Sequence, residues 1–524
     1  MPIYEVIPTS GVPIKVFTDQ LEAKARAQLI LLAESGFAEE FVAAMPDVHY
    51  GRGATIGSVF ASSRMVCPNA VGVDIGCGMA AVPFPGVRAS ELGQDRLWEL
   101  HALIKKRIPT GMTVHEKAQW APVLDDPART SWLSSQLTGR ALRSLGTLGG
   151  GNHFIEIVHD PEGGVWAMLH SGSRNLGKIT ADRYNDMAKA QMAARGEAPR
   201  HGDLNALLLE SPEGQEYILD MQWCQKFAWA NRQAMLEILG RIMEESTGVS
   251  PDWNGMVNIH HNFCSREQCR FRNQAGEWIE RELWVTRKGA TSARQDQRGL
   301  IPGSMAVGSW LVQGQGNWES WYSCSHGAGR QKSRTASFTE IDQKDFEQAM
   351  HGIVAETVPE LRDEAPQAYK DLGQVMEWQR DLVTPVRRLL PLINVKGWVR
   401  TGTGERGYAP AARVKVTVAL KDATGLGLHV ESVEVHIAEK AAGKPSASWI
   451  VPADYVMRCG PNLAGSARQV WVRSPASHPG KKVLVECTIE SADLESIVLR
   501  MDRVRKTVAE APGQGGDSHP GTEG

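Results

Sequence analysis

Apolar and polar residues alternate with the two-residue period of a β-strand in three stretches near the C-terminal end, at residues 412–420, 433–437 and 482–490. Side chains on a strand point to opposite faces in turn, so these stretches predict a β-rich module of about five strands over residues 412–506. Residues 398–411 are rich in Gly, Thr and Arg and are typical of a linker. Residues 507–524 have the composition of a disordered tail. Residues 1–397 then form a separate main domain.

Within the main domain, apolar residues recur with the period of a helix over residues 18–34, 180–195 and 216–247. Thr18 or Asp19 is the expected N-cap of the first helix. Between the helices, short apolar segments run into loops that contain several glycines. The pattern predicts an α+β domain in which strands carry glycine loops around a central site, with helices outside.

Bulk composition narrows the functional classes. The chain has 524 residues, 42% of them hydrophobic and 22% charged, and a net charge of −3. There is no apolar run long enough to span a bilayer and no signal-peptide pattern at Met1, so a cytoplasmic protein is expected. Eight cysteines without a tight repeat do not indicate a disulfide framework. The net charge excludes a global basic field, so a nucleic-acid site must be a local groove.

Five residues have the side chains of metal ligands. Asp74 and Cys77 lie three apart in a glycine-broken apolar segment, where a buried carboxylate needs a partner. His153 and His170 are predicted at strand ends, each beside glycine or serine, and His261 is one of two adjacent histidines after a long helix. A mixture of oxygen, sulfur and imidazole suits Mn, Fe, Co or Zn better than Mg or Ca. Five ligands exceed one tetrahedral site, so we predict two metals that share Cys77. The alternative for Cys77 alone is a small buried apolar residue.

A second candidate centre is the segment Ser323–Arg330, where His326 stands among small residues and precedes Gly327 and Gly329. Glycine N–H groups can line an anion site, and Arg330 offers a planar fork for phosphate oxygens. A histidine in this setting can bind a metal, transfer protons or attack phosphorus. The alternative is a glycine-rich turn with a structural histidine. Basic residues gather near these loops and form the local groove: Arg287, Lys288, Arg294, Arg298, Arg330, Lys332 and Arg334.

Several motifs in a fixed order resemble one family. They are Met45–His49, Val73–Gly78, Gly151–Glu156, His170–Arg174, His261–Asn262, Thr286–Ala290, Gly303–Met305, His326–Arg330 and Val395–Gly397. Through them, residues 1–397 resemble the RtcB family of RNA ligases along essentially their whole length. Members of that family use GTP and Mn to seal broken RNA, including tRNA halves after intron removal.

The resemblance implies a role for each matching residue. Asp74, Cys77, His153, His170 and His261 would bind two Mn²⁺ ions, and His326 would attack the α-phosphorus of GTP. Asp47, Arg174 and Arg330 would lie near the RNA. The nucleotide would be held by Asn152, Glu156, Ser304, Ser309, Gly327, Ala328, Gly329, Tyr369 and Lys396. The implied partners are GTP, RNA ends and, as a further candidate, an activating protein, but no membrane.

Two features depart from the family pattern. Ala306 stands where many relatives have glycine, and relatives commonly end at the Lys-Gly that is Lys396–Gly397 here. The resemblance says nothing about residues 398–524. Three alternatives stay open beside RNA ligation: a metal-dependent phosphoesterase for cyclic phosphates or capped ends, a non-catalytic RNA-binding scaffold, and a repair enzyme that prefers other ends, such as DNA 3′-phosphates.

Overall fold

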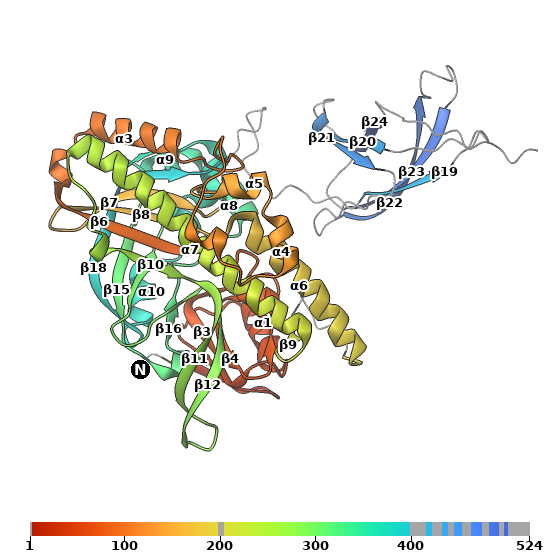
Figure 1. Ribbon diagram of the computed structural model, residues 1–524, viewed down its shortest axis with the longest axis horizontal. Helices are drawn as coiled ribbons and strands as arrows, with labels where there is room; N and C mark the ends of the chain where they lie inside the picture. The colour runs from red at the N-terminus through yellow and green to blue at the C-terminus, as the bar shows by residue number, and fades with distance from the viewer. Residues whose placement is uncertain are drawn as a thin grey trace, which may run out of the picture. The chain divides into compact units, whose positions relative to one another are not determined.

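The computed structural model describes residues 3–197, residues 204–398 and six strands between residues 416 and 500. The chain divides into two compact units, Met1–Tyr408 and Ala409–Gly524 (Figure 1). The strands of the second unit form two three-stranded sheets, in the orders β19-β23-β22 and β21-β20-β24. Their bounds are β19 (Val416–Lys421), β20 (Ser432–Ala438), β21 (Pro445–Pro452), β22 (Leu463–Arg473), β23 (Lys482–Ser491) and β24 (Ile497–Arg500). The predicted tail and all but the first residue of the predicted linker lie outside the described residues.

The larger sheet of the first unit has the strand order β10-β6-β8-β7-β18-β15-β14, with β17 paired to β18. The strands along this order pair antiparallel, whereas β17 is parallel to β18. Their bounds are β6 (Gly78–Arg88), β7 (Phe154–His159), β8 (Gly164–Ser171), β10 (Val257–His260), β14 (Arg298–Pro302), β15 (Ser309–Gly314), β17 (Val354–Ala355) and β18 (Val383–Lys396).

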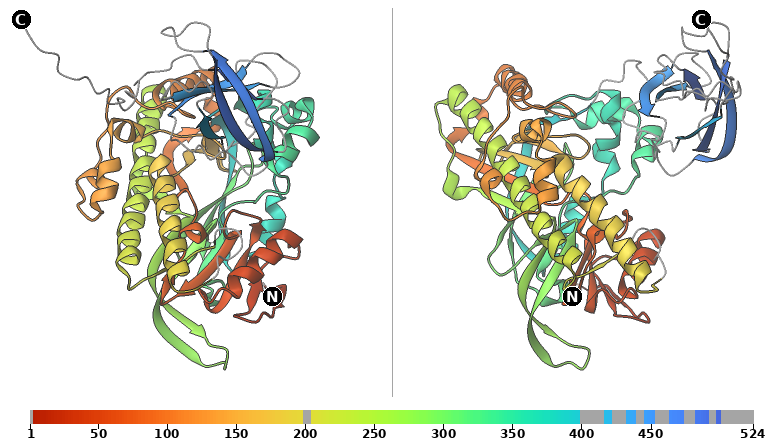
Figure 2. Two further views of the ribbon diagram at one scale, coloured as in Figure 1. Left: turned by 90° about the vertical axis from the view of Figure 1, so that its right-hand side faces the viewer. Right: turned by 45° about the vertical axis from the view of Figure 1, so that its right-hand side comes forward.

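A second sheet has the order β1-β2-β3-β4-β12-β11. Its strands are β1 (Glu5–Ile7), β2 (Ile14–Val16), β3 (Glu39–His49), β4 (Ile56–Ser62), β11 (Asn262–Arg272) and β12 (Trp278–Lys288). The long hairpin of β11 and β12 extends beyond the body of the unit (Figure 2). Two further pairs of short strands are β13 (Ala290–Ser292) with β16 (Ser323–Ser325), and β5 (Met65–Val66) with β9 (Leu207–Leu208).

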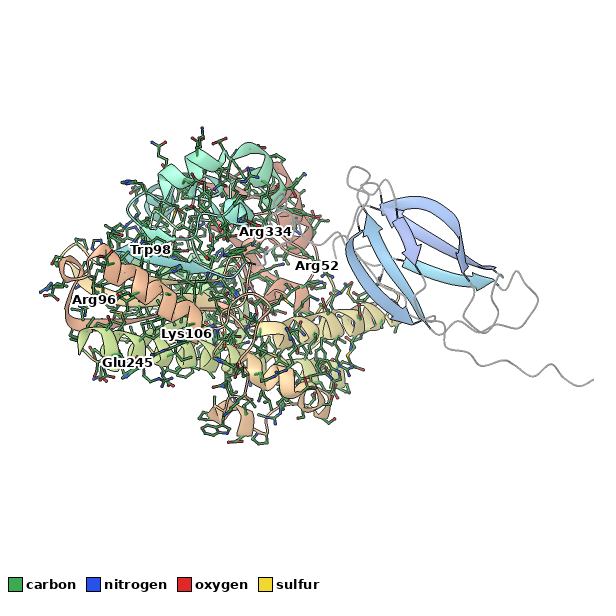
Figure 3. The ribbon with its side chains drawn as sticks, turned by 90° about the horizontal axis from the view of Figure 1, so that it is seen from above. Arg52, Arg96, Trp98, Lys106, Glu245 and Arg334 are labelled. Atoms are coloured by element: carbon green, nitrogen blue, oxygen red, sulfur yellow. The ribbon has the colours of Figure 1, made fainter. Side chains whose placement is uncertain are left out.

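Long helices cover one face of the larger sheet (Figure 1). Leu100 of α3 and Met235 and Leu239 of α7 pack in one buried cluster with Val82 of β6 and Leu169 of β8. The outward side of α3 presents Arg96, Trp98 and Lys106, with Glu245 of α7 beside it (Figure 3). The α-helices are α1 (Ala23–Ala33), α2 (Pro68–Val71), α3 (Gln94–Arg107), α4 (Ser131–Gln136), α5 (Gly139–Ser144), α6 (Arg174–Ala194), α7 (Pro212–Thr247), α8 (Arg334–Glu340), α9 (Gln343–Ala349) and α10 (Leu372–Trp378).

The architecture confirms the predicted α+β class, with one correction at the first helix. This helix, α1, starts at Ala23 and has Glu22 as its N-cap, so neither Thr18 nor Asp19 caps it. The Thr18 hydroxyl instead accepts a hydrogen bond from the Gln20 amide at 3.0 Å and starts a local turn before the helix begins. None of the described helices combines the length and the apolar character that crossing a bilayer requires.

Candidate functional site

The register of the larger sheet brings the predicted metal ligands to one edge. Gly78, at the start of β6, pairs with His260 at the end of β10 and with Ser171 at the end of β8. His170 on β8 in turn pairs with Phe154, the first residue of β7. Because these neighbouring strands are antiparallel, residues just before β6 and β7 meet residues at the ends of β8 and β10.

At this edge the five predicted ligands form two overlapping groups, and Cys77 belongs to both. One group holds Cys77, His170 and His261, and the other holds Asp74, Cys77 and His153. The Cys77 Sγ lies 3.2 Å from His170 Nε2 and 3.4 Å from His153 Nε2. His170 Nε2 is 3.2 Å from His261 Nε2, and His153 Nε2 is 3.1 Å from Asp74 Oδ2. Each group has the side chains to hold a metal ion, and the two groups share the Cys77 sulfur.

The protonation states of the cluster also fit a metal. Burial lowers the pKa of His170 and of His261 far below the ordinary imidazole value, so both rings are neutral and can donate a lone pair. Burial raises the pKa of the Cys77 thiol, which a bound cation would reverse. Burial opposes ionisation of Asp74, but His153 and Arg174 outweigh it and lower the Asp74 pKa. His261 Nδ1 is buried and has no hydrogen-bond partner among the residues described.

Backbone carbonyls orient two of the imidazoles. His153 Nδ1 lies 2.9 Å from the Leu148 carbonyl oxygen, and His170 Nδ1 lies 3.1 Å from that of Asn152. A ring whose Nδ1 faces a carbonyl turns its Nε2 toward the other ligands, and the neutral ring with the proton on Nδ1 is the tautomer that a metal needs. The two carbonyls thus orient both Nε2 atoms into the cluster.

Arg232 of α7 braces the loop that carries Cys77. Its side chain is fully buried and donates to the carbonyl oxygens of Gly76, at 2.7 Å, and Ser171, at 3.0 Å. Burial lowers the pKa of Arg232 to about 10, so the guanidinium remains charged near pH 7. Sequence reasoning missed this residue, because an arginine within an amphipathic helix gives no sign that it faces inward.

His326 stands beside the metal cluster, immediately after β16. Its ring centroid lies 4.9 Å from that of His261. His326 Nδ1 is 2.5 Å from the buried Asp47 Oδ2. The two atoms are close enough for an ion pair, but the N–H direction does not meet the geometry of a hydrogen bond. The same carboxylate oxygen accepts the His326 backbone N–H at 3.2 Å. Asp47 therefore fixes the ring from behind and leaves Nε2 as the free nitrogen.

Glycine is required next to His326 at two positions with left-handed backbone. Gly289 has a φ of 61°, and a Cβ there would come within 2.2 Å of Ile56 Cγ2 and 3.3 Å of His326 Cε1. Gly329 has a φ of 73°, and a Cβ there would meet the Asp47 carbonyl oxygen at 2.5 Å. Only glycine allows both the backbone angle and the close approach.

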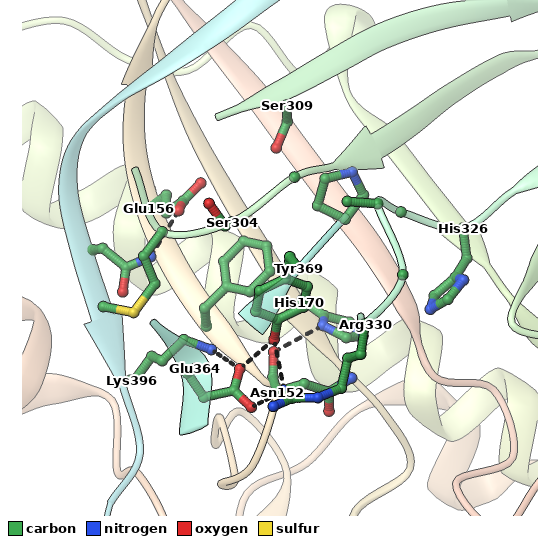
Figure 4. A pocket seen from close by; sticks show the side chains of 18 of the residues that line it. Asn152, Glu156, His170, Ser304, Ser309, His326, Arg330, Glu364, Tyr369 and Lys396 are labelled. Carbon is green, nitrogen blue, oxygen red and sulfur yellow. Dashed lines mark hydrogen bonds and ion pairs between the residues drawn. The ribbon is translucent and has the colours of Figure 1, made fainter. Parts of the chain in front are cut away.

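A cavity of about 240 Å³ opens between His170 and His326. All nine residues predicted to hold the nucleotide line it: Asn152, Glu156, Ser304, Ser309, Gly327, Ala328, Gly329, Tyr369 and Lys396 (Figure 4). The wall also contains residues that sequence reasoning did not assign to the nucleotide: His49, Phe154, Met305, Arg330, Arg334, Glu364 and Asn394. Of these, Glu364 lies in a Pro- and acid-rich stretch without a motif, so no sequence signal singled it out.

Two cavity groups are neutral near pH 7. Glu156 is buried, which raises its pKa to about 8, and its Oε1 accepts a 2.7 Å hydrogen bond from Asn394 Nδ2. Burial lowers the pKa of His49 to about 4. A protonated carboxyl can donate as well as accept a hydrogen bond, so Glu156 can offer either a donor or an acceptor to a ligand.

Glu364, by contrast, is ionised and collects several donors (Figure 4). Burial alone would raise its pKa, but Lys396, Arg334 and Arg330 outweigh burial and lower the pKa to about 2. Lys396 Nζ and the Tyr369 hydroxyl each donate to Oε2 at 2.7 Å. Arg334 Nη1 and Arg330 Nη1 donate to Oε1 at 2.8 and 3.2 Å. The cavity wall is therefore a pre-formed network of ion pairs.

The three residues predicted near RNA occupy different places. Arg330 is in the cavity wall, and Asp47 lies beneath His326. Arg174 begins α6 with a φ of 58° and donates from Nε to Thr147 Oγ1 at 2.9 Å, on the Asp74 side of the cluster. The structure thus separates Arg174 from the cavity and gives Asp47 a contact with His326 that the sequence did not indicate.

Comparisons with known proteins identify the family of this chain. The model of the family described as tRNA-splicing ligase RtcB matches residues 28–130 and 123–397. RNA-splicing ligase RtcB of Escherichia coli (strain K12) is 39% identical over 417 residues, which cover 75% of this chain and 100% of the relative. RNA-splicing ligase RtcB of Mycobacterium bovis is 31% identical over 424 residues, which cover 68% of this chain and 96% of the relative.

An archaeal relative extends the same similarity. The tRNA-splicing ligase RtcB of Aeropyrum pernix is 28% identical over 450 residues, which cover 71% of this chain and 92% of the relative. The family model ends at Gly397, so residues 398–524 lie outside the matched region. The match over residues 28–397 and the full coverage of the E. coli relative confirm the predicted resemblance: the chain belongs to the RtcB family.

Proposed function

We propose that the protein is a GTP- and Mn-dependent RNA ligase that joins a 2′,3′-cyclic phosphate or 3′-phosphate end to a 5′-hydroxyl end. The observation that carries the proposal is the position of His326. Its ring lies 4.9 Å from that of His261, which belongs to the group of Cys77, His170 and His261, and His326 also lines the cavity. A nucleophile that adjoins both a candidate metal site and a cavity suits transfer of a nucleotidyl group.

In the proposed reaction, His326 would act as the nucleophile and Asp47 would orient it. The His326 Nε2 lone pair would attack the α-phosphorus of GTP, pyrophosphate would leave, and GMP would remain on His326 as a phosphoramidate. Asp47 would hold the opposite ring nitrogen and stabilise the positive charge that develops on the imidazole. A 2′,3′-cyclic phosphate would first be opened by water to a 3′-phosphate and a 2′-hydroxyl. GMP would then pass from His326 to the 3′-phosphate, and attack by the 5′-hydroxyl would join the strands and release GMP. Each transfer exchanges one bond to phosphorus for another.

Asp74, Cys77, His153, His170 and His261 would hold two Mn²⁺ ions. When bound, the ions would neutralise phosphate charge and orient the attacking and leaving oxygens. Arg330, Arg334 and Lys396 provide positive charge for the nucleotide from the protein side. Glu156 lies across the view of Figure 4 from His326, and it provides a polar group there together with its hydrogen-bond partner Asn394.

We assign catalysis to residues 1–397, because every residue of the cluster and the cavity lies there. The proposal leaves the module over residues 412–506 without a role in the chemistry. As an enzyme for RNA ends it would work in the cytoplasm, with broken RNA and tRNA halves as substrates.

Ligation itself tests the function. The purified full-length protein is incubated with Mn²⁺, GTP and two RNA strands, one with a 2′,3′-cyclic phosphate and one with a 5′-hydroxyl. The expected product is a strand of summed length that requires both GTP and His326. Hydrolysis of the cyclic phosphate without joining, and without need of GTP, would favour the phosphoesterase. Faster joining of DNA 3′-phosphate ends than of RNA ends would favour the repair enzyme, and no reaction would favour the scaffold.

A further inference from the structure

Glu364 differs from the other charged groups of the cavity in how its contacts are divided. It lies in a short 3₁₀ segment, Pro359–Glu364, and is 1% exposed. Its Oε1 accepts hydrogen bonds from the guanidinium groups of Arg330 and Arg334. Its Oε2 accepts hydrogen bonds from Lys396 and Tyr369. One carboxylate therefore joins two sets of side chains from different parts of the chain.

The first set follows His326 in sequence. Arg330 comes four residues after His326 in the same loop, and Arg334 begins α8. Both arginines also donate to the neighbouring Asp363. Arg334 donates to the Asp363 carboxylate, and Arg330 donates to the Asp363 backbone carbonyl oxygen. The loop that carries His326 is thereby tied to Glu364.

In the second set, Lys396 lies across the view of Figure 4 from His326, and Tyr369 lies between the two. Lys396 is the last residue of β18, is 5% exposed and pairs in register with Phe154 of β7. The Tyr369 hydroxyl, which shares Oε2 with Lys396, also lies 3.3 Å from Arg330 Nη1. Lys396 and Tyr369 are thus fixed relative to the histidine loop through one side chain.

We propose that Glu364 is a positioning residue for the nucleotide, tying the arginines that follow His326 to Lys396 and Tyr369 so that the loop of His326 and the end of β18 stay fixed relative to each other. The inference rests on the proposed function, since it takes GTP as the ligand. Glu364 acts through its partners: without its charge, three cations would face one another in a buried cavity. Lys396 and the arginines would then move apart, and the α-phosphorus would no longer be placed against His326 Nε2.

The test is the GTP dependence of label transfer from α-labelled GTP to full-length protein with Mn²⁺, for the wild type and Glu364→Gln. The amide keeps the shape but removes the charge. We expect the half-saturating GTP concentration to rise at least tenfold, with the maximal label per protein near the wild-type level. We also expect ATP to compete more strongly relative to GTP, because Lys396 and Tyr369 lose their anchor.

Glu267→Gln is the matched control. Glu267 is a partly buried carboxylate, with its side chain 11% exposed, that also pairs with two arginines, Arg287 and Arg294, but it is not in the cavity wall. The control should leave the half-saturating GTP concentration within about threefold of wild type, even if it lowers the melting temperature. Equal rises in both variants would overturn the inference, because loss of a buried charge anywhere would then explain them.

A second variant covers poor folding of Glu364→Gln. Glu364→Asp keeps the charge but shortens the side chain, so it can hold one set of partners and not both. We expect a smaller rise in half-saturating GTP than for the amide, with unchanged bound metal. A wild-type value for either folded variant contradicts the positioning role. Absence of label on the wild type itself would instead contradict the proposed function.

Discussion

The metal cluster and the nucleotide cavity adjoin at His170, yet they are built in opposite ways. The cluster consists of a carboxylate, a buried thiol and three imidazoles, and burial keeps His170 and His261 neutral. The cavity wall, by contrast, includes full charges that neutralise one another around Glu364. The cluster thus offers lone pairs suited to an ion, whereas the charged side chains of the cavity are already paired with one another. Changes in the cluster should abolish chemistry, and changes in the cavity should weaken binding.

The largest expected effect is at Cys77, which both ligand groups share. Cys77→Ala should reduce bound Mn²⁺ from two ions to one or none per chain, and should slow label transfer from GTP by on the order of a thousandfold. Metal content after dialysis is the first measurement. Cys224→Ala is the control, since Cys224 is equally buried in α7 and its thiol lies beside the Thr180 hydroxyl instead of the metal ligands. Retention of two ions by Cys77→Ala would contradict the bridged cluster.

Asp47 should come next, because it belongs to neither region but orients the nucleophile between them. Asp47→Asn keeps the size of the side chain and removes the charge behind His326 Nδ1. We expect label transfer to slow by roughly a hundredfold, while bound Mn²⁺ and the half-saturating GTP concentration stay near wild type. A single-turnover rate at saturating GTP measures this. A change in metal content instead of rate would place Asp47 with the cluster.

A smaller effect concerns pH, and it belongs to the cavity alone. Burial raises the pKa of Glu156 to about 8 in the ligand-free protein, so below pH 8 its carboxyl is protonated. The N1–H and N2–H₂ groups of guanine need an acceptor, and binding them would favour the carboxylate. GTP affinity should therefore rise with pH by up to about tenfold per unit between pH 6 and 8, and level off above.

The pH dependence is measured as GTP binding to His326→Ala, which cannot react covalently. Glu364, with a pKa of about 2, and His49, with a pKa of about 4, do not titrate in this range. Glu156→Gln should remove the slope. An unchanged slope in that variant would show that another group releases the proton.

The smallest effect is expected from stopping the chain after Gly397. All the cavity residues precede this position. The shortened chain would lack the hydrogen bond that the Trp398 indole donates to Glu356 at 2.6 Å, and Glu356 is not part of the cavity wall. Label transfer should stay within about threefold of the full chain. Loss of labelling, or a gain above tenfold, would mean that residues 398–524 act on the cavity.

The two regions also differ in how far the sequence predicted them. The five metal ligands stand in short motifs at strand ends, where residue type and local pattern suffice, and the structure brings all five together. Lys396 and Tyr369 were reached only through the family resemblance. Glu364 and Arg232 have no local signal at all: their importance comes from burial and from partners more than thirty residues away. Long-range packing of this kind leaves no mark on neighbouring residues.

Secondary structure was likewise predicted where a local pattern marks it and missed where it does not. The 36-residue helix α7 was predicted because its apolar residues keep the helical period over many turns. The N-cap of α1 was misplaced, because Thr18 and Asp19 are common capping residues and nothing nearby marks Glu22 as the boundary. The strand order of the larger sheet joins β7 to β18 across more than two hundred residues, and no local pattern encodes such a pairing.

The most direct test of the central claim is covalent labelling of His326. Full-length protein and His326→Ala are incubated with GTP labelled at the α-phosphate and with Mn²⁺, then denatured. The account predicts label on the wild type that survives base and is lost in acid, as expected for a phosphoramidate, and none on the variant. Equal label on both proteins, or none on metal-loaded wild type, would contradict the claim that His326 is the nucleophile between the metal cluster and the cavity.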